Sequence, residues 1–338
     1  MPEDVLTKEN AKQLFEEKIR TAVKLTPGQN SQSYLTDDGY ILREAISDKA
    51  VQDYLKEERY TPLIHQDQYL AAKTPLVYSV EKGETICSIH KGIRGQTMIG
   101  KKPVSDSNIH FEELSKHQQD KLAEEIGTYL AHLHNLSADG FEKAEWQGWE
   151  NHFETDEKKI RSVVSKFGIK YNPSAKCRTD MVVCHGDFHS GNFLIDLNGE
   201  EILSGVIDFG EAGLGTPAKD FMTLYSGAGR HFTRKIVESY NKTALKPMTM
   251  EELDFHMARK MTQWMDFCKD KPQKQEKIGE MLKEMKTDQE IERVEKKRED
   301  LNSRKEAKKQ PYQAPVSREL SQEEINKVSQ YLRGGRGQ

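Results

Sequence analysis

Side chains able to bind ions or move protons are concentrated in the short stretch Val182–Gly213, near two apolar runs rich in β-branched residues. Among them are His185, Asp187, Asn192 and Asp208. Two kinds of site use such a set. One is a metal ion held by histidine and carboxylate, and the other is a cradle for nucleotide phosphates built from carboxylate and amide oxygens. The spacing of the residues distinguishes the two.

A histidine-ligated metal site would need more ligands than this stretch provides. His185, Asp187 and His189 alternate as on one face of a strand, and the further ligands would be His132 and His134. These two lie in a segment with helical spacing, where residues two apart point about 200° away from each other and cannot reach one ion. The glycines in HGDFHSG also indicate a loop, not a continued strand. The histidine-ligated site is therefore the weaker interpretation.

Two motifs in this stretch resemble those of a known family. HGDFHSGN, residues 185–192, is similar to the H-x-D-x-x-x-x-N catalytic loop of the aminoglycoside phosphotransferase and choline kinase group. VIDFGEAG, residues 206–213, resembles the metal-binding segment of the same group. Two motifs in order, each after a strand-like run, are far more specific than either alone. The resemblance covers roughly Leu14 to Cys268 and implies the fold of the protein kinases.

The resemblance implies roles for the polar side chains. Phosphoryl transfer requires that the γ-phosphate be held in line with an acceptor oxygen and that its charge be neutralised. Asp187 would be the catalytic residue that accepts or orients the proton of the acceptor hydroxyl. Asn192 and Asp208 would hold Mg²⁺ against the phosphates of ATP, with GTP not excluded. His185 would orient the loop, and His189 would either contact the acceptor or lie exposed in the loop.

The phosphates also need a cover and a cation from the N-terminal part of the chain. TPGQNSQSY lies at the expected first hairpin, where Gly28, Gln29, Asn30 and Ser31 would bring backbone amides close to the phosphates. Most turns of this kind only reverse the chain, so the assignment depends on the resemblance. Arg43 follows the third strand-like run, where protein kinases carry lysine, and would pair with the phosphates. The alternative is an exposed arginine at a strand end.

A glutamate on the next helix is expected to hold that arginine. In DYLKEERYTPLI the flanking apolar positions favour Glu57, with Glu58 as the alternative, and a solvated charge pair is the simpler interpretation of either. The run TICSIHKGIRGQ would connect the two lobes, where main-chain groups between His90 and Gly92 would bind the base. Asp220 would brace the catalytic loop.

The elements that must position these residues are readable from the periodicity of the apolar side chains. They follow in this order: a helix at 10–20, a three-strand meander at 21–45, a helix at 48–65, strands at 76–80 and 85–89, and a helix at 112–136. With the resemblance, this predicts an α+β bilobal protein kinase-like fold. Residues 1–92 would form a small antiparallel nucleotide-binding lobe, and residues 93–268 a larger, mainly helical lobe for catalysis and acceptor binding.

Residues 269–338 differ from the rest in composition. They are highly charged with mixed sign and poor in large apolar residues, and their thin apolar stripe does not hold a strict heptad. A solvated, partly helical or disordered extension is the simpler interpretation. The sharper interpretation is a helix that binds a protein partner.

Charge and composition limit the class of protein. A net charge of −4 and a sequence pI near 6.3 imply no general attraction to nucleic acid or to anionic lipid. No apolar run approaches the roughly 18 residues that a membrane span needs. The four cysteines lack the paired spacing of a zinc site or a disulfide framework. We therefore expect a cytoplasmic protein that binds neither nucleic acid nor membrane.

The expected function is ATP-dependent transfer of the γ-phosphate to a hydroxyl of a small polar acceptor, which is aminoglycoside-, sugar- or amino alcohol-like. The interval from Asp208 to Asp220 is short and lacks the A-P-E ending of regulated protein kinases, which favours a small-molecule acceptor. Trp146, Trp149 and Trp264 would line the acceptor pocket or belong to the core. The alternative is a nucleotide-binding pseudokinase or scaffold that acts through its C-terminal extension. The presence of all three residues of the expected site favours the enzyme.

Overall fold

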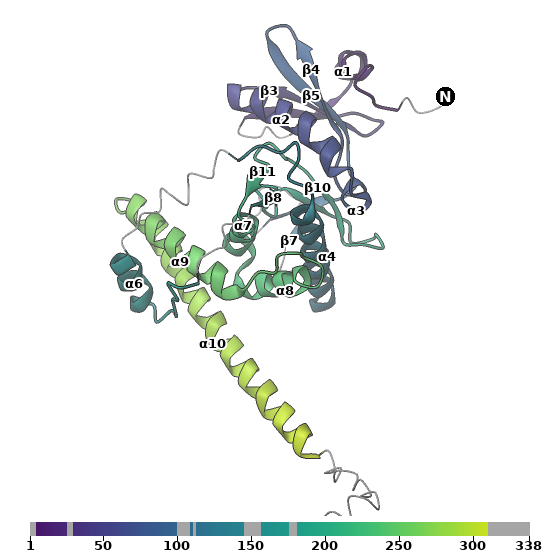
Figure 1. The fold of residues 1–338 in the computed structure, drawn as a ribbon. Coiled ribbons are helices and arrows are strands. Elements are labelled where there is room, and N and C mark those ends of the chain that lie inside the picture. Colours follow the sequence, from purple (N-terminus) through teal and green to yellow (C-terminus); the bar gives the residue numbers. More distant parts are fainter. Residues whose placement is uncertain are drawn as a thin grey trace, which may run out of the picture. The chain divides into compact units, whose positions relative to one another are not determined.

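The computed structural model describes residues 5–25, 30–99, 109–110, 113–144, 157–175 and 181–309. Its N-terminal region is a five-stranded antiparallel sheet in the order β1-β2-β3-β5-β4 (Figure 1). The strands are β1 (Val23–Lys24), β2 (Ser31–Leu35), β3 (Tyr40–Ala45), β4 (Val77–Lys82) and β5 (Thr85–Lys91). The β2–β3 turn needs Gly39, whose φ of 80° lies in the left-handed region that favours glycine. The expected meander is therefore present, although its first strand is only two residues long.

Two helices contact this sheet. Helix α1 (Ala11–Lys18) buries Leu14 and Phe15 in one apolar cluster with Leu42 and Ile89. Helix α2 (Asp48–Ile64) begins after Ser47, whose hydroxyl accepts a hydrogen bond from the third backbone N–H of the helix.

Helix α2 buries one face along its whole length. Its buried residues include Ala50, Tyr54, Glu57 and Tyr60, at intervals of three and four residues, as expected for one side of a helix. Glu57 is therefore an acidic residue on the buried face of an otherwise amphipathic helix, and such a carboxylate requires a partner.

The C-terminal region is mainly helical. Its helices are α3 (Gln68–Ala71), α4 (Lys116–Asn135), α6 (Glu157–Lys166), α7 (Ala218–Ala228), α8 (Arg230–Tyr240) and α9 (Met250–Phe267). Helices α4 and α9 both begin with a capping box, at Ser115 and Thr249. Helices α4 and α8 pack closely at Gly127. A Cβ atom at this position would lie only 2.5 Å from the carbonyl oxygen of Ile236, so the close approach requires glycine.

Short strands carry the motif residues in this region. They are β6 (Gln96–Ile99), β7 (Ile109–His110), β8 (Val182–Cys184), β9 (Phe193–Ile195), β10 (Leu203–Val206) and β11 (Gly213–Gly215). Strand β10 pairs with β9 so that Val206 lies opposite Phe193, and β8 pairs with β11. Each motif thus begins where one of these strands ends.

The compact unit extends beyond the expected boundary at 268. Helix α9 does end at Phe267, but α10 (Pro272–Lys309) follows, and its Ile278, Leu282 and Met285 are buried against α6 and α9. The chain divides into a unit at residues 1–289 and a second at 290–338. The apolar stripe of the extension is thus, in its first part, core of the larger unit.

The antiparallel sheet and the helical region together confirm the α+β fold expected from the sequence. Among the described helices, none combines the length and the apolarity that crossing a bilayer requires.

Candidate active site

The loop between β8 and β9 holds the first motif in a tight conformation. Gly186 has a φ of 85°, which a residue with a side chain rarely adopts. The backbone N–H of Asn192 donates to the carbonyl of His189 at 2.8 Å, and the side-chain NH₂ group of Asn192 donates to the carbonyl of Asp187 at 3.0 Å. The side-chain nitrogen of Asn192 is therefore occupied within the loop, which leaves its side-chain oxygen for another partner.

Asp208 is brought beside Asn192 by the pairing of β10 with β9. The backbone N–H of Ile207 donates to the carbonyl of Asn192 at 2.9 Å, so the two motif residues are neighbours across the end of this pairing. Asp208 has a φ of 70°, the one positive value among the described residues other than glycine. Such a conformation costs on the order of 1 kcal/mol and is concentrated at functional sites. Its exposed carboxylate makes no hydrogen bond or ion pair with the described residues.

Asp187 and His189 interact within the loop. The Nε2 atom of His189 lies 3.4 Å from a carboxylate oxygen of Asp187, while its Nδ1 accepts the N–H of Gly191 at 2.9 Å. The contact with His189 lowers the pKa of Asp187, although burial opposes this, and the same contact raises the pKa of His189. Asp187 is thus an ionised, half-exposed carboxylate near neutral pH. His189 was expected either to contact the acceptor or to lie exposed in the loop. In the structure it is a partly exposed loop residue that pairs with the carboxylate of Asp187.

His185 is fully buried and joins the two motifs. Its Nε2 lies 3.0 Å from the carbonyl of Ile207, and its Nδ1 accepts the N–H of Asp187 at 3.3 Å. The ring packs against Phe188 and Phe209. His185 therefore orients the loop, as the sequence predicted.

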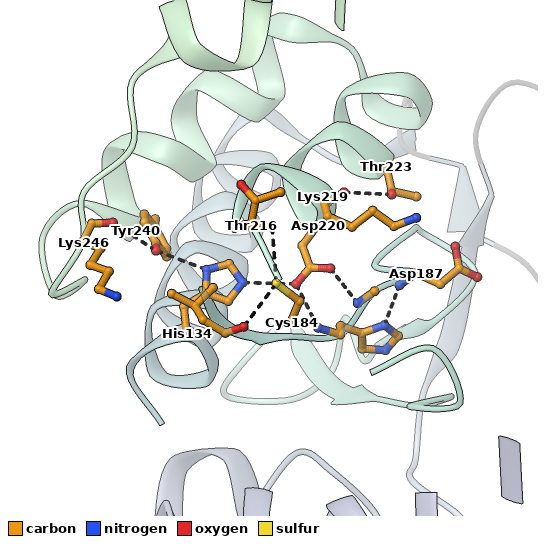
Figure 2. Close-up of polar contacts among 12 residues, drawn as sticks. His134, Cys184, Asp187, Thr216, Lys219, Asp220, Thr223, Tyr240 and Lys246 are labelled. Atoms are coloured by element: carbon orange, nitrogen blue, oxygen red, sulfur yellow. Dashed lines mark hydrogen bonds and ion pairs between the residues drawn. The ribbon is translucent and has the colours of Figure 1, made fainter. Parts of the chain in front are cut away.

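Asp220, in the first turn of α7, braces the same loop from the other side. One carboxylate oxygen accepts the N–H of His185 at 2.9 Å, and the other accepts the N–H of Gly186 at 2.8 Å (Figure 2). His134 of α4 reaches the first oxygen through Nε2 at 3.1 Å and the hydroxyl of Tyr240 through Nδ1 at 3.1 Å. Burial alone would raise the pKa of Asp220, but its contact with His134, together with smaller contributions from His185 and the Gly186 N–H, outweighs burial and lowers the pKa.

The brace also includes a thiol. Ligand atoms of His134, Cys184 and Asp220 lie within 4.8 Å of one another, an arrangement that could hold a metal ion. However, both oxygens of Asp220 accept hydrogen bonds, and the thiol of Cys184 donates to the carbonyl of Thr216 at 3.3 Å. All three side chains are buried. Hydrogen bonding therefore accounts for this cluster as a support of the loop.

Arg43 and Glu57 form a buried ion pair, so the structure selects Glu57 of the two glutamates. The guanidinium of Arg43 contacts both oxygens of Glu57, donates from Nε to the hydroxyl of Ser88 at 2.8 Å, and lies over the ring of Tyr54. Burial alone would lower the pKa of Arg43, but Glu57 outweighs it and raises the pKa. Arg43 is therefore a buried, charged residue, not an exposed one.

Glu57 also contacts the segment that begins at Asp208. One of its oxygens accepts the backbone N–H of Phe209 at 3.0 Å, directly after Asp208. Glu58 instead contacts the hydroxyl of Ser79 and the ammonium of Lys8. A single carboxylate on α2 thus joins strand β3 to the segment that begins at Asp208.

The expected phosphate cover is described only in part. Gly28 and Gln29 lie outside the described residues. Asn30 accepts the N–H of Ile46 through its carbonyl at 2.9 Å, and its side-chain oxygen lies 3.2 Å from the hydroxyl of Ser47. Ser31 opens β2. Both residues therefore lie at the base of the expected loop, next to the start of α2.

The structure narrows the expectation for the base-binding segment. His90 lies in β5, buried between β3 and β4, and burial together with Arg43 lowers its pKa to about 3, so that it is neutral. The N–H of Gly92 already donates to the carbonyl of Gly39 at 2.8 Å. This N–H is therefore not free for a base in this structure, and a base would have to meet other main-chain groups of the segment.

Of the three tryptophans, only Trp264 is described, because Trp146 and Trp149 lie outside the described residues. Trp264 is on α9, and the ammonium of Lys260 lies over its ring, 4.6 Å from the ring centre. Ser88, whose hydroxyl accepts a hydrogen bond from Arg43, was not predicted from the sequence, because a serine within a strand belongs to no motif. Nor did the sequence single out Lys219 and Lys260, although Lys219 precedes the brace residue directly.

Comparisons with known proteins agree with this geometry. A model of the phosphotransferase enzyme family matches residues 21–259. The GDP complex of wild-type aminoglycoside 2'-phosphotransferase-IIIa is a similar solved structure, with a TM-score of 0.58 and 16% identity, covering 83% of this chain and 99% of that one. ADP-bound aminoglycoside phosphotransferase APH(2'')-Ib is another, with a TM-score of 0.52 and 21% identity, covering 82% of this chain and 97% of that one. At these identities the two structures show the fold.

The family model spans well over half of the chain, and its range includes both motifs, the Arg43–Glu57 pair and the brace at Asp220. The chain therefore belongs to the phosphotransferase enzyme family and has the protein kinase-like fold.

Proposed function

We propose that this protein transfers the γ-phosphate of a nucleoside triphosphate to a hydroxyl of a small polar acceptor, with Asp187 as the catalytic carboxylate. The observation that carries the proposal is the adjacency of Asn192 and Asp208, joined through the Ile207 N–H and the Asn192 carbonyl at 2.9 Å. The loop that holds Asn192 also holds Asp187. One small region thus offers an ionised carboxylate and, beside it, two oxygen ligands.

Asn192 and Asp208 would hold Mg²⁺. The donors fit this ion, because carboxylate and amide oxygens are ligands that Mg²⁺ prefers. The side-chain nitrogen of Asn192 is turned into the loop, and the Asp208 carboxylate has no hydrogen bond or ion pair with the described residues. When bound, the ion would neutralise charge on the phosphates.

Asp187 would act on the acceptor. Its carboxylate accepts a hydrogen bond from the acceptor hydroxyl and orients the oxygen toward the γ-phosphorus. The new bond forms between this oxygen and the γ-phosphorus, the bond from phosphorus to the β-γ bridging oxygen breaks, and the hydroxyl proton passes to Asp187. The low pKa of Asp187 keeps it ionised before transfer. The work of the protein is therefore mainly positioning and charge stabilisation.

Arg43 would bind the α- and β-phosphates. Glu57 and the hydroxyl of Ser88 hold the guanidinium in one orientation, and Glu57 ties it to the segment after Asp208. Similar solved structures contain GDP, ADP and, with streptomycin, ATP. These support ATP or GTP as the phosphate donor, and we propose ATP.

The acceptor class expected from the sequence, aminoglycoside-, sugar- or amino alcohol-like, stays a proposal. So do the cytoplasmic location and a protein partner for residues 269–338. Because the first part of α10 is packed into the larger unit, a partner helix would have to use residues beyond 289.

A thermal shift measurement tests the nucleotide and metal part. MgATP should raise the melting temperature, since ligand at 100 times its Kd stabilises the folded state by about 2.7 kcal/mol. ATP with a chelator should give a smaller shift, and Asp208→Asn should remove the difference between the two conditions. The exposed Asp270→Asn serves as the matched control and should behave as wild type. Equal shifts with and without Mg²⁺ would contradict the metal assignment.

Turnover then separates an enzyme from a pseudokinase. Asp187→Asn should keep the MgATP shift and lose nearly all acceptor-dependent release of ADP, because only the carboxylate that receives the proton is changed. If turnover survives this substitution, Asp187 is not the catalytic carboxylate. If the wild-type protein binds MgATP but catalyses no phosphate transfer to any hydroxyl compound, the scaffold alternative would be favoured.

A further inference from the structure

Two lysines lie beside the catalytic loop on the side formed by α7 and α9. Lys219 is in the first turn of α7, and Figure 2 shows its side chain extending toward Asp187. Lys260 is on α9, where its ammonium lies 3.3 Å from the hydroxyl of Ser226 on α7 and over the ring of Trp264. The two helices are packed together. Lys219 thus extends toward Asp187 from α7, and Lys260 lies on the neighbouring α9, where the charges of Lys219 and Asp187 both act on it.

The electrostatic neighbours of these groups place the lysines away from the proposed metal site. Arg43 and His189 both feel the charge of Asp208. Lys260 instead feels Lys219 and Asp187, and Asp187 in turn feels Lys219. Arg43 is thus coupled to Asp208, whereas the two lysines are coupled to Asp187. An acceptor whose hydroxyl meets Asp187 would therefore lie near the lysines, on the α7 and α9 side of the loop.

The charge of Lys260 is poorly compensated in this structure. Burial and the like charge of Lys219 lower its pKa to about 8, and only Asp187 acts in the opposite direction. In the described part of the chain, the partners of its ammonium are a hydroxyl and an aromatic face, not a carboxylate. The hydroxyl of Ser226 donates its own proton to the carbonyl of Met222 at 2.8 Å, so it faces Lys260 as an acceptor. A desolvated ammonium of this kind is stabilised by an anion.

We propose that the acceptor carries an anionic group, a carboxylate or a phosphate, which binds between Lys219 and Lys260 while its hydroxyl meets Asp187. The inference rests on the proposed function, because it identifies the acceptor of that same site. A polycationic acceptor is disfavoured at this place, because two like charges already face it.

The first experiment measures ADP release from MgATP with compounds matched in size but not in charge. D-gluconate supplies a carboxylate, glucose 6-phosphate a phosphate, glucose a neutral reference and kanamycin a polycation. One of the two anions should stimulate ADP release at least about tenfold more than glucose and kanamycin, and which one does so distinguishes carboxylate from phosphate. Stimulation by glucose or kanamycin and not by the anions would overturn the inference while leaving the phosphotransferase proposal intact.

Variants then assign the effect to the lysines. Lys260→Gln and Lys219→Gln should each raise the acceptor KM by about 10- to 100-fold, with a far smaller change in kcat and in the KM for MgATP. Lys260→Arg keeps the charge and should recover most of the loss. Lys269→Gln, an exposed lysine after α9, is the control and should match wild type. A rise in the KM for MgATP instead would assign the lysines to the triphosphate and overturn the inference.

A binding measurement decides the matter even if no compound of the panel is phosphorylated. An amine with a pKa of about 8 reacts faster with an acylating reagent than ordinary exposed lysines, so modification of Lys260 can be followed by mass spectrometry. Gluconate or glucose 6-phosphate should protect Lys260, and glucose should not. No protection by either anion would overturn the inference. The MgATP thermal shift, run in parallel, reports on the proposed function independently.

Discussion

Replacing Asp220 by asparagine should lower the free energy of unfolding of the protein and also disturb the loop that holds Asp187. Asp220 is fully buried and accepts three hydrogen bonds, from the backbone of His185 and Gly186 and from His134. Asparagine has one oxygen, which can still accept from both His185 and His134. Its NH₂ group then faces the N–H of Gly186, so that two donors oppose each other. One charge-assisted hydrogen bond is lost and a buried donor is left unsatisfied.

The expected loss follows from these two effects. A hydrogen bond to a charged group contributes about 1.5–3 kcal/mol, and an unsatisfied buried donor costs about 1–3 kcal/mol. The effects overlap, so we expect Asp220→Asn to lower the free energy of unfolding by about 2–4 kcal/mol. Acceptor-dependent turnover should fall about 10- to 100-fold, because displaced loop backbone moves the carboxylate of Asp187 away from its working position.

Urea unfolding followed by circular dichroism measures the loss of stability, with the exposed Asp270→Asn as the matched control, expected within about 0.5 kcal/mol of wild type. The pH dependence gives a second check. The pKa of Asp220 is held below its ordinary value of 3.8, so its contribution to stability is present above that value and is lost as the pH falls below it. The difference between wild type and Asp220→Asn should thus be constant from pH 8 to 5 and shrink below about pH 4. A loss under about 1 kcal/mol, or a difference that grows in acid, would refute the reasoning.

Three further substitutions have defined outcomes. Arg43→Ala leaves Glu57 buried without its partner, so urea unfolding should show a loss of about 3–5 kcal/mol, whereas a loss below about 1 kcal/mol would mean that the pair is solvated. His90 has a pKa lowered to about 3, so the folded state binds no proton there between pH 6.5 and 3 while the unfolded state does. Wild type should therefore lose about 2 kcal/mol more than His90→Gln on going from pH 7 to 5, and equal losses would argue against a neutral, buried His90. Leu282→Ala should cost about 2–4 kcal/mol because this side chain of α10 is fully buried, and the half-exposed Val294→Ala should cost less than about 0.5 kcal/mol; equal effects would contradict the packing of α10.

Much of the fold was predictable because its signals are local. Apolar periodicity and turn residues predicted the antiparallel N-terminal sheet, helix α2 and helix α4, and the structure confirms the α+β arrangement. The extension after residue 268 was harder to place. Its first apolar residues are widely spaced among charges, and only the neighbouring surfaces of α6 and α9 make them core.

The site divides in the same way. The motif residues were readable because each motif has a fixed local spacing, and the roles assigned to Asp187, Asn192 and Asp208 remain proposals to be tested. The choice of Glu57 followed from helical spacing, since Glu57 lies on the buried face of α2. By contrast, the occupation of the Gly92 amide by the Gly39 carbonyl depends on how two strand ends meet, which no local pattern encodes. The same holds for Lys260, which contacts Ser226 only because α9 packs on α7.

One carboxylate serves two lobes in this molecule. Glu57 holds the Arg43 guanidinium and, with the same group, the backbone directly after Asp208. In the proposed mechanism, the arginine that would bind the phosphates and the segment that would hold Mg²⁺ are therefore both held by Glu57, and a change at Glu57 would affect both. A protein engineer who wishes to change donor preference without loss of turnover should thus leave Glu57 untouched and vary the segment after β5 instead.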